Sequence, residues 1–216
     1  MTPTYLTRAL ESIKNQTHKD YKVYLVGDRY DNHSEFVKLA ESILPKNNIY
    51  YTNLDRAKER DLYPLGSLEL WCSGGVNARN RAIDIALADG VHYICPLDHD
   101  DYWSSNHLKA INNVLESKEA DFVYTCSTYL DSILPIQQLT SEIVPSIPQP
   151  GKLIHSSVCI NYDKIPLKYR DVYSEIGIVE AADYDLWKRV SKYIPEHTLK
   201  SYLVAELTCY HPNERC

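Results

Sequence analysis

Three carboxylates within four positions, Asp98, Asp100 and Asp101, directly follow the short apolar run Tyr93-Ile94-Cys95-Pro96-Leu97. Ionised carboxylates less than about 6 Å apart raise one another's pKa unless a cation neutralises them. Mg²⁺ or Mn²⁺ is usually held by one or two protein carboxylates together with phosphate oxygens and water. The cluster therefore predicts half of a divalent-metal site that carries a nucleoside diphosphate. A solvated acidic turn after a strand is the alternative, and the cluster alone does not decide between the two.

Length and charge set limits on the class of protein. The 216 residues, 44% hydrophobic and 24% charged, suit one globular domain spanning residues 1–216. The net charge of −6 gives no reason to expect a nucleic-acid partner, which would need clustered Lys and Arg. No apolar run approaches the ~20 residues of a membrane span, and the N-terminus lacks the apolar core of a signal peptide. We therefore expect a cytoplasmic protein. The six cysteines are scattered without zinc-type pairs, and most are expected to be small buried hydrophobes.

Helix-like and strand-like segments alternate along the chain. Apolar periodicity predicts helices around residues 6–13, 34–44, 76–88, 106–116 and 181–193. Apolar runs predict strands at 21–26, 49–52, 91–97, 121–125, 153–162 and 201–208. This alternation predicts an α/β layered domain with a mostly parallel, mixed central sheet flanked by helices. The polar segment 53–73 receives no element, and 127–152 is expected to form a long excursion or small hairpin near the site.

Four motifs occur in order over nearly the whole chain. They are Tyr5–Thr17, Gly75 with Ala78-Arg79-Asn80, Leu97–Trp103 and Asp183–Trp187. Together they resemble family 2 glycosyltransferases of the GT-A fold. The resemblance implies transfer of a sugar from a nucleoside-diphosphate donor, commonly a UDP-sugar, with Mn²⁺ or Mg²⁺ and inversion at the anomeric carbon. It implies a glycan or other hydroxyl compound as the acceptor. It also implies that residues 1–126 bind the nucleotide sugar and residues 127–216 bind the acceptor. The chain could be the catalytic part of a longer protein.

The resemblance assigns the acidic cluster to the donor's diphosphate. Asp98 and Asp100 match the family's DxD pair, and Asp101 follows it. These residues are expected to hold the ribose and, through the metal, the phosphates, so that charge developing on the leaving diphosphate is neutralised. Which of Asp98, Asp100 and Asp101 touches the metal directly is left open. The candidate metal ligands are Asp100, Asp101 and His211. Arg79 matches an arginine near the base and diphosphate.

Three further residues take roles from the resemblance. Asp28 matches the carboxylate that accepts a hydrogen bond from the donor's base, commonly uracil, although Gly27 replaces the family's other acid. Asp183 matches the general base of inverting members, with Ala182 where the family usually has Glu. Helix capping is the alternative for Asp183. His211 matches a late histidine that some members use as a metal ligand, which favours Mn²⁺.

Neighbouring residues are expected to play smaller parts. His99 is expected to be a spacer, Asp185 to be solvated and Trp187 to belong to the core. His155 and Ser156 lie where relatives often place contacts to the acceptor.

One departure from the family concerns the start of the chain. Relatives begin with a strand that forms part of the nucleotide pocket, whereas this sequence opens at Met1-Thr2-Pro3-Thr4-Tyr5, directly at its first predicted helix. The strand is lost, replaced by a shortened substitute, or present in upstream residues. Two other functions stay open, the first because it can share a nucleotide-binding half of this kind and the second because of the missing strand and the replaced acids at Gly27 and Ala182. These are a nucleotidyltransferase that releases pyrophosphate, and a catalytically silent domain that binds a sugar nucleotide or glycan.

Overall fold

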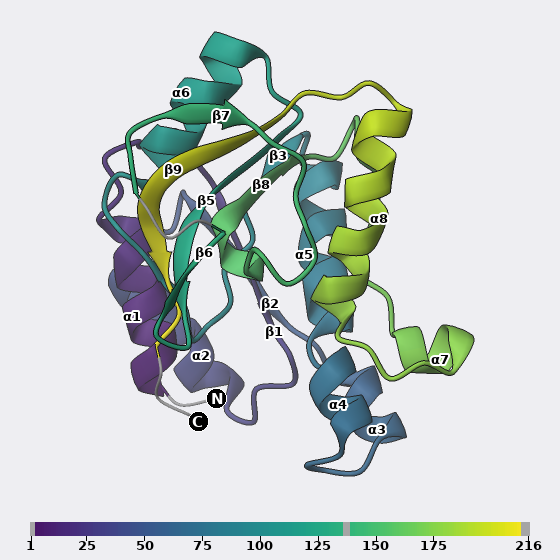
Figure 1. The fold of residues 1–216 in the computed structure, drawn as a ribbon. Coiled ribbons are helices and arrows are strands. Elements are labelled where there is room, and N and C mark those ends of the chain that lie inside the picture. The colour runs from purple at the N-terminus through teal and green to yellow at the C-terminus, as the bar shows by residue number, and fades with distance from the viewer. Residues whose placement is uncertain (1–2, 136–138, 213–216) are drawn as a thin grey trace.

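The computed structural model, which describes residues 3–135 and 139–212, alternates helices and strands along the chain (Figure 1). The helices are α1 (Pro3–Lys14), α2 (His33–Ile43), α3 (Lys58–Leu62), α4 (Leu68–Ser73), α5 (Val76–Ala88), α6 (His107–Lys118), α7 (Val172–Ile176) and α8 (Ala182–Glu196), with a 3-10 turn, η1, at His155–Ser157. The strands are β1 (Val23–Gly27), β2 (Ile49–Asn53), β3 (Tyr93–Ile94), β4 (Tyr102–Trp103), β5 (Phe122–Tyr129), β6 (Ser132–Leu134), β7 (Ile143–Pro145), β8 (Val158–Asn161) and β9 (Ser201–Tyr210).

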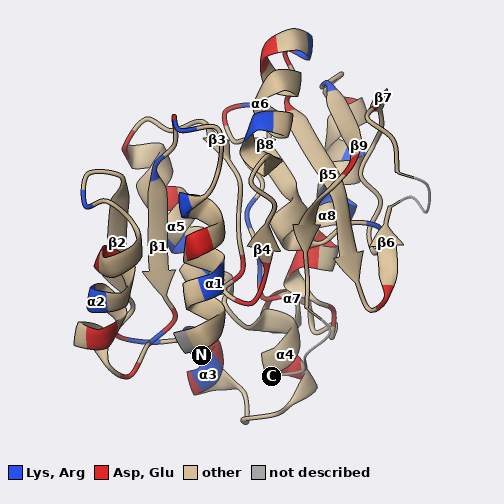
Figure 2. Ribbon diagram, turned by 90° about the vertical axis from the view of Figure 1, so that its left-hand side faces the viewer, with Lys and Arg blue, Asp and Glu red and all other residues tan. Residues whose placement is uncertain are grey.

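The strands form two separate sheets. A two-stranded sheet pairs β1 with β2, and a seven-stranded sheet has the order β3-β8-β5-β9-β4, with β6 added to β5 and β7 to β9. Figure 2 shows the small sheet on one side of α1 and the large sheet on the other. The predicted α/β class is confirmed. The strand pairs β1–β2 and β5–β9 are parallel, and the other pairs are antiparallel. The sheets are therefore mixed, as predicted, but mostly antiparallel rather than mostly parallel.

The large sheet carries packed apolar residues on both faces. Successive side chains of a strand point to opposite faces. Accordingly Phe122 of β5 packs with Trp187 of α8, whereas its neighbour Val123 packs with Ile111 of α6. Trp187 is 1% exposed, which confirms its predicted place in the core. This packing fixes the strands that lead into the candidate site.

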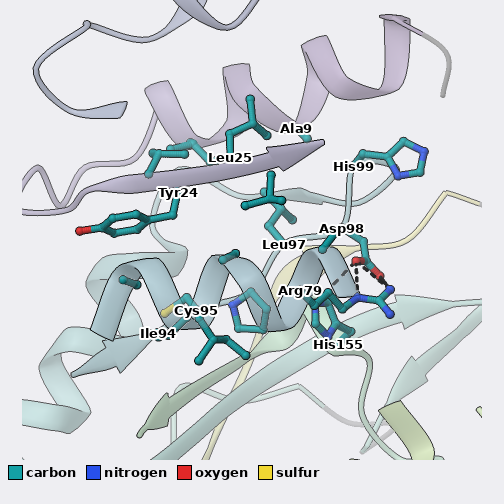
Figure 3. Close-up of a pocket in the computed structure, with 18 of the residues that line it drawn as sticks. Ala9, Tyr24, Leu25, Arg79, Ile94, Cys95, Leu97, Asp98, His99 and His155 are labelled. Atoms are coloured by element: carbon teal, nitrogen blue, oxygen red, sulfur yellow. Dashed lines mark hydrogen bonds and ion pairs between the residues drawn. The ribbon is translucent and has the colours of Figure 1, made fainter. Parts of the chain in front are cut away.

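A cavity of about 1190 Å³ separates the two sheets. Strand β1 pairs only with β2 and β3 only with β8 among the described strands, and residues of both β1 and β3 line the cavity. Helices α1 and α5 line it as well; Figure 3 shows Ala9, Leu25 and Leu97 around it. Pro3 already belongs to α1, so the shortened substitute for a first strand does not form within the described residues, and Met1 and Thr2 lie outside them.

The predicted elements agree with the structure for the long segments. All predicted helices are present, but α3 and α4 occupy the segment that received no element, and α7 and β4 were not predicted. The strands predicted at 91–97 and 153–162 shorten to β3 and β8, because Pro96 interrupts the first and the 3-10 turn η1 precedes the second. The predicted excursion contains β6, which forms a hairpin with the end of β5, and β7. In the described part of the chain, no helix combines the length and apolar character that crossing a membrane requires.

Candidate active site

An ion pair between Arg79 and Asp98 lies at the centre of the site (Figure 3). Arg79 Nη2 is 2.9 Å from Asp98 Oδ2 and 3.0 Å from Oδ1. Gly75 opens α5 with a φ of 78°, which glycine adopts without strain, and Arg79 also donates to the Gly74 carbonyl at 3.1 Å. Burial raises the pKa of Asp98, but Arg79 and His155 outweigh it and hold that pKa well below its ordinary value. Both partners of the pair are therefore charged.

A buried histidine and tyrosine support this ion pair. His155 Nε2 is 3.6 Å from Asp98 Oδ1, and its Nδ1 is hydrogen-bonded to the Tyr169 hydroxyl at 2.6 Å. Burial lowers the pKa of His155 to about 4, against the opposing effect of Asp98, so the ring is neutral near pH 7. The Asn80 side chain fixes Tyr169, because it donates to the Tyr169 carbonyl at 2.8 Å and accepts from its N–H at 3.1 Å.

Ser156 fixes the acidic turn, residues 98–101, through two hydrogen bonds. Its Oγ accepts the N–H of Asp98 at 3.0 Å and donates to the carboxylate of Asp101. The indole N–H of Trp103 donates to the Ser156 carbonyl at 2.7 Å. His155 and Ser156 are both buried. The 3-10 turn η1 directs both side chains toward the acids, and their expected contacts with the acceptor stay a prediction.

Asp101 and His211 form a second pair. Strand β9 pairs with β4 through Tyr210 and Tyr102, which brings His211 Nδ1 to 2.6 Å from Asp101 Oδ1. The hydrogen bond with Asp101 raises the pKa of His211. Burial raises the pKa of Asp101, although His211 opposes this effect. Two of the three candidate metal ligands are thus in direct contact.

Asp100, the third candidate ligand, makes different contacts, although its charge also raises the pKa of His211. Its carboxylate is partly exposed, with His99 Nδ1 3.9 Å away, and Arg8 of α1 donates to its backbone carbonyl at 3.0 Å. Among the described residues, no three His, Cys, Asp or Glu side chains converge as a metal centre. Carboxylate oxygens and an imidazole nonetheless suit Mn²⁺ when diphosphate oxygens complete its coordination. The donor set fits a shared metal of this kind, and the assignment of ligands stays a prediction.

Asp28 directly follows β1 and lines the same cavity. Its Oδ2 is 3.5 Å from Arg60 Nη2, whereas its Oδ1 is buried without a hydrogen-bond partner among the described residues. An unpaired buried acceptor costs free energy, so this oxygen is suited to a donor group on a ligand. The structure also explains the glycine before it: a Cβ on Gly27 would lie 2.5 Å from Asn53 Oδ1, so the family's second acid does not fit here.

Two carboxylates of α8 have opposite environments. Asp183, in the first turn, accepts the N–H of Tyr184 at 2.8 Å and is close enough to affect the pKa of Arg79, His155 and Tyr169. Asp185 is buried, and its oxygens are 2.6 Å from Arg170 Nη2 and 2.8 Å from Arg189 Nε. The expectation that Asp185 is solvated is wrong, because helical spacing turns it inward beside Leu186 and two arginines cover it.

The fold brings together most of the residues predicted for the site. Asp98, Asp100, Asp28 and Arg79 line one cavity, and Asp101 with His211 adjoins the same turn. The sequence analysis gave no role to Tyr169, and none to Asn80 beyond its place in a motif. Asn80 and Tyr169 are 89 positions apart, so only the fold shows their contact.

Sequence comparisons identify related proteins, although no family model matches the chain. An uncharacterised glycosyltransferase of Acanthamoeba polyphaga mimivirus is 33% identical over 224 residues, which cover 99% of this chain and 89% of that protein. An uncharacterised glycosyltransferase of Rickettsia conorii is 26% identical over 219 residues, which cover 93% of this chain. The chain spans only 31% of the length of that rickettsial protein.

Structural comparison finds S. aureus TarS. Its crystal structure with UDP-GlcNAc matches 99% of this chain with a TM-score of 0.70 and 13% identity. Its complex with UDP matches 96% of the chain with a TM-score of 0.67 and 14% identity. The chain spans 56% of the crystallised TarS chain in each case. At this low identity, the likeness establishes the fold alone.

Proposed function

Because the chain belongs to the family 2 glycosyltransferases of the GT-A fold, we propose that it transfers a sugar from a UDP-sugar to a hydroxyl of a glycan or glycoconjugate. The transfer is metal-dependent and inverts the anomeric carbon. The main support is the Arg79–Asp98 ion pair, which joins α5 to the acidic turn and lies close enough to Asp183 for that carboxylate to affect the pKa of Arg79. That TarS was crystallised with UDP and with UDP-GlcNAc supports UDP as the nucleotide.

The donor is proposed to lie across the ends of β1 and β3. Asp28 Oδ1, buried and unpaired among the described residues, accepts a hydrogen bond from the base. Asp98 binds the ribose, and the Arg79 guanidinium, whose pKa Asp98 raises despite its burial, stays cationic beside the diphosphate. In this proposal residues 1–126 supply the donor site and 127–216 the acceptor site of a single domain.

The candidate ligands Asp100, Asp101 and His211 are proposed to hold Mn²⁺ or Mg²⁺. When bound, the ion neutralises the charge that develops on the leaving diphosphate. Ser156 fixes the Asp101 carboxylate by hydrogen bonding, and Arg8 fixes the backbone of Asp100. These contacts hold the acids in place before the donor binds, so that little reorganisation is needed during transfer.

Asp183 is proposed to be the general base. It takes the proton of the acceptor hydroxyl as that oxygen attacks the anomeric carbon on the face opposite the diphosphate. A base needs a carboxylate that no cation occupies, and Asp183 has no ion pair within the described residues, whereas Asp185 has two arginines. The first turn of α8 also favours negative charge through the helix dipole.

A test of the donor site combines UDP-glucose or UDP-GlcNAc with Mn²⁺ and measures UDP release. Asp100→Ala is expected to abolish metal-dependent release, whereas Asp31→Ala, at an exposed position outside the site, keeps it. Failure of the wild-type chain to bind any nucleotide sugar with any divalent metal would reject the proposal. Release of pyrophosphate from UTP would identify a nucleotidyltransferase instead.

Asp183→Asn tests the base. Loss of a general base costs about 10²- to 10⁴-fold in rate. The variant is expected to lose transfer by this factor and to retain UDP binding, measured by calorimetry. Asp163→Asn, an exposed carboxylate paired with His92, is the matched control and is expected to retain transfer. Nucleotide-sugar binding without any wild-type transfer would point to a catalytically silent domain.

A further inference from the structure

Two cysteines face each other where β3 meets β8. The register pairs Ile94 with Ile160, and its continuation by one residue places Cys95, just past the end of β3, opposite Cys159. The backbone N–H of Tyr162 donates to the His92 carbonyl at 2.9 Å, so His92 and Tyr162 are a hydrogen-bonded pair. Hydrogen-bonded and non-hydrogen-bonded pairs alternate along an antiparallel ladder. Cys95 and Cys159 are therefore a non-hydrogen-bonded pair, with a Cα separation of about 4.5 Å. That separation lies within the range of about 4.4–6.8 Å that disulfides span.

The two thiols touch but differ in access. A hydrogen bond from the Cys159 thiol to Cys95, together with burial, raises the pKa of Cys159 well above its ordinary value. Both residues line the cavity between the sheets, but Cys159 is 1% exposed, whereas Cys95 is half-buried (Figure 3). Cys95 is therefore the thiol that a reagent in the cavity reaches first, while Cys159 stays protonated and almost fully buried next to it.

We propose that Cys95 and Cys159 are a dithiol site that a low-molecular-weight disulfide, such as oxidised glutathione, converts into a cross-strand disulfide. The Cys95 thiolate attacks one sulfur of the reagent, and one glutathione thiolate leaves. Cys159 then loses its proton to water, attacks the Cys95 sulfur of the mixed disulfide and expels the second glutathione. Two protein thiols are oxidised and one glutathione disulfide is reduced to two thiols, which take up the two protons.

The disulfide would join the segment that leads into the acidic turn to the segment that follows Ser156, which holds that turn. Cys95 lies three positions before Asp98, and Cys159 lies three positions after Ser156. Asp98 and Ser156 are already hydrogen-bonded at 3.0 Å. The disulfide therefore closes a loop of about 65 residues without separating the partners of the site, and by loop-closure entropy it raises the melting temperature by roughly 5–15 °C.

The test incubates the full chain with oxidised and reduced glutathione at set ratios and digests it without reduction. The expected product is a peptide pair joined through Cys95 and Cys159, with a loss of two hydrogens and a higher melting temperature that dithiothreitol reverses. Cys72→Ser, which removes a buried cysteine elsewhere, is expected to form the same bond. Peptide mapping also separates this bond from any that involve Cys216, which lies outside the described residues.

Single variants show the order of events. Cys159→Ser is expected to stop at a stable mixed disulfide of Cys95 with glutathione, because no second thiol is present to release it. Cys95→Ser is expected to leave Cys159 unmodified until the chain is denatured. A mixed disulfide that persists on Cys95 of the wild-type chain, or a wild-type chain that keeps both thiols under oxidising ratios, would overturn the proposal.

Discussion

The two sheets of this molecule differ in how their interiors are filled. In the large sheet, Val158 and Ile160 of β8 and Phe122 of β5 have no exposed surface. In the small sheet, Leu25 and Val26 of β1 are only half-buried, because the cavity of about 1190 Å³ lies beside them. The candidate site spans both regions. Its acidic turn rests on packed residues, whereas its proposed base-binding side rests on a strand with open space next to it.

This difference extends to the polar groups. On the side of the large sheet, Asp98 and Asp101 each have side-chain partners that fix their positions. On the side of the small sheet, Asp28 has an oxygen without a partner in the described part of the chain. Preorganised charge is most useful where charge develops during a reaction. Under the proposed function, the side of the site that binds the diphosphate is preorganised, and the side that binds the nucleobase is completed by its ligand.

The largest expected effect compares one truncation in each sheet. Ile160→Ala removes fully buried methylenes from a packed core, which costs about 2–5 kcal/mol of unfolding free energy. Leu25→Ala removes a half-buried side chain that already faces a cavity, so its cost is expected to stay below about 1.5 kcal/mol. Urea unfolding of both variants measures the difference. Equal costs would mean that the cavity is filled in solution and that the two regions are packed alike.

The next effect depends on pH. His107 is fully buried beside β9, with its Nδ1 2.8 Å from Thr208 Oγ1, and burial lowers its pKa to about 3. Below the ordinary histidine pKa of about 6.5, His107 binds a proton in the unfolded chain but stays neutral in the folded protein. The free energy of unfolding therefore falls as pH drops from 6.5 towards 3. Between pH 6.5 and 5 the wild type is expected to lose about 1.6 kcal/mol more unfolding free energy than His107→Gln.

The control for this pH effect lies in the other region. His33→Gln, at an exposed position on α2 beside the small sheet, is the matched control for the loss of a histidine. Urea midpoints at pH 6.5 and 5 compare the three proteins. If His107→Gln follows the wild type at both pH values, the ring is not held neutral by burial.

The same contrast explains how much of the fold the sequence predicted. Helices α1, α2, α5, α6 and α8 each bury a long apolar face, and that periodicity can be read locally. Helices α3, α4 and α7 have five or six residues, too few to show a period. They depend on distant contacts such as Tyr63 with Asp171, whose atoms lie 2.6 Å apart across 108 positions. The predicted strand at 91–97 shortens to β3, and Pro96 within it has no N–H to donate.

The candidate site was predictable in its residue types but not in its pairings. The acids after the predicted strand suggested a diphosphate site from the sequence, and the resemblance to the family added Arg79 to it. The expectation that Asp185 is solvated failed because the sequence does not show that Arg170, 15 positions away, covers it. The support from His155 and Ser156 was missed for the same reason, since these residues reach the acids across 57 and 58 positions.

The smallest expected effect has opposite signs in the two regions. Ala82 of α5 lines the cavity, so Ala82→Leu adds apolar atoms to open space and is expected to raise the unfolding free energy by about 1 kcal/mol. Ala205 of β9 is 2% exposed in the packed sheet, and Ala205→Leu is expected to cost about 1–3 kcal/mol through overpacking. Urea unfolding measures both. Because the substitutions add the same atoms, only the space around them differs, and a loss of stability in both variants would show that the region between β1 and β3 has no room for a larger side chain.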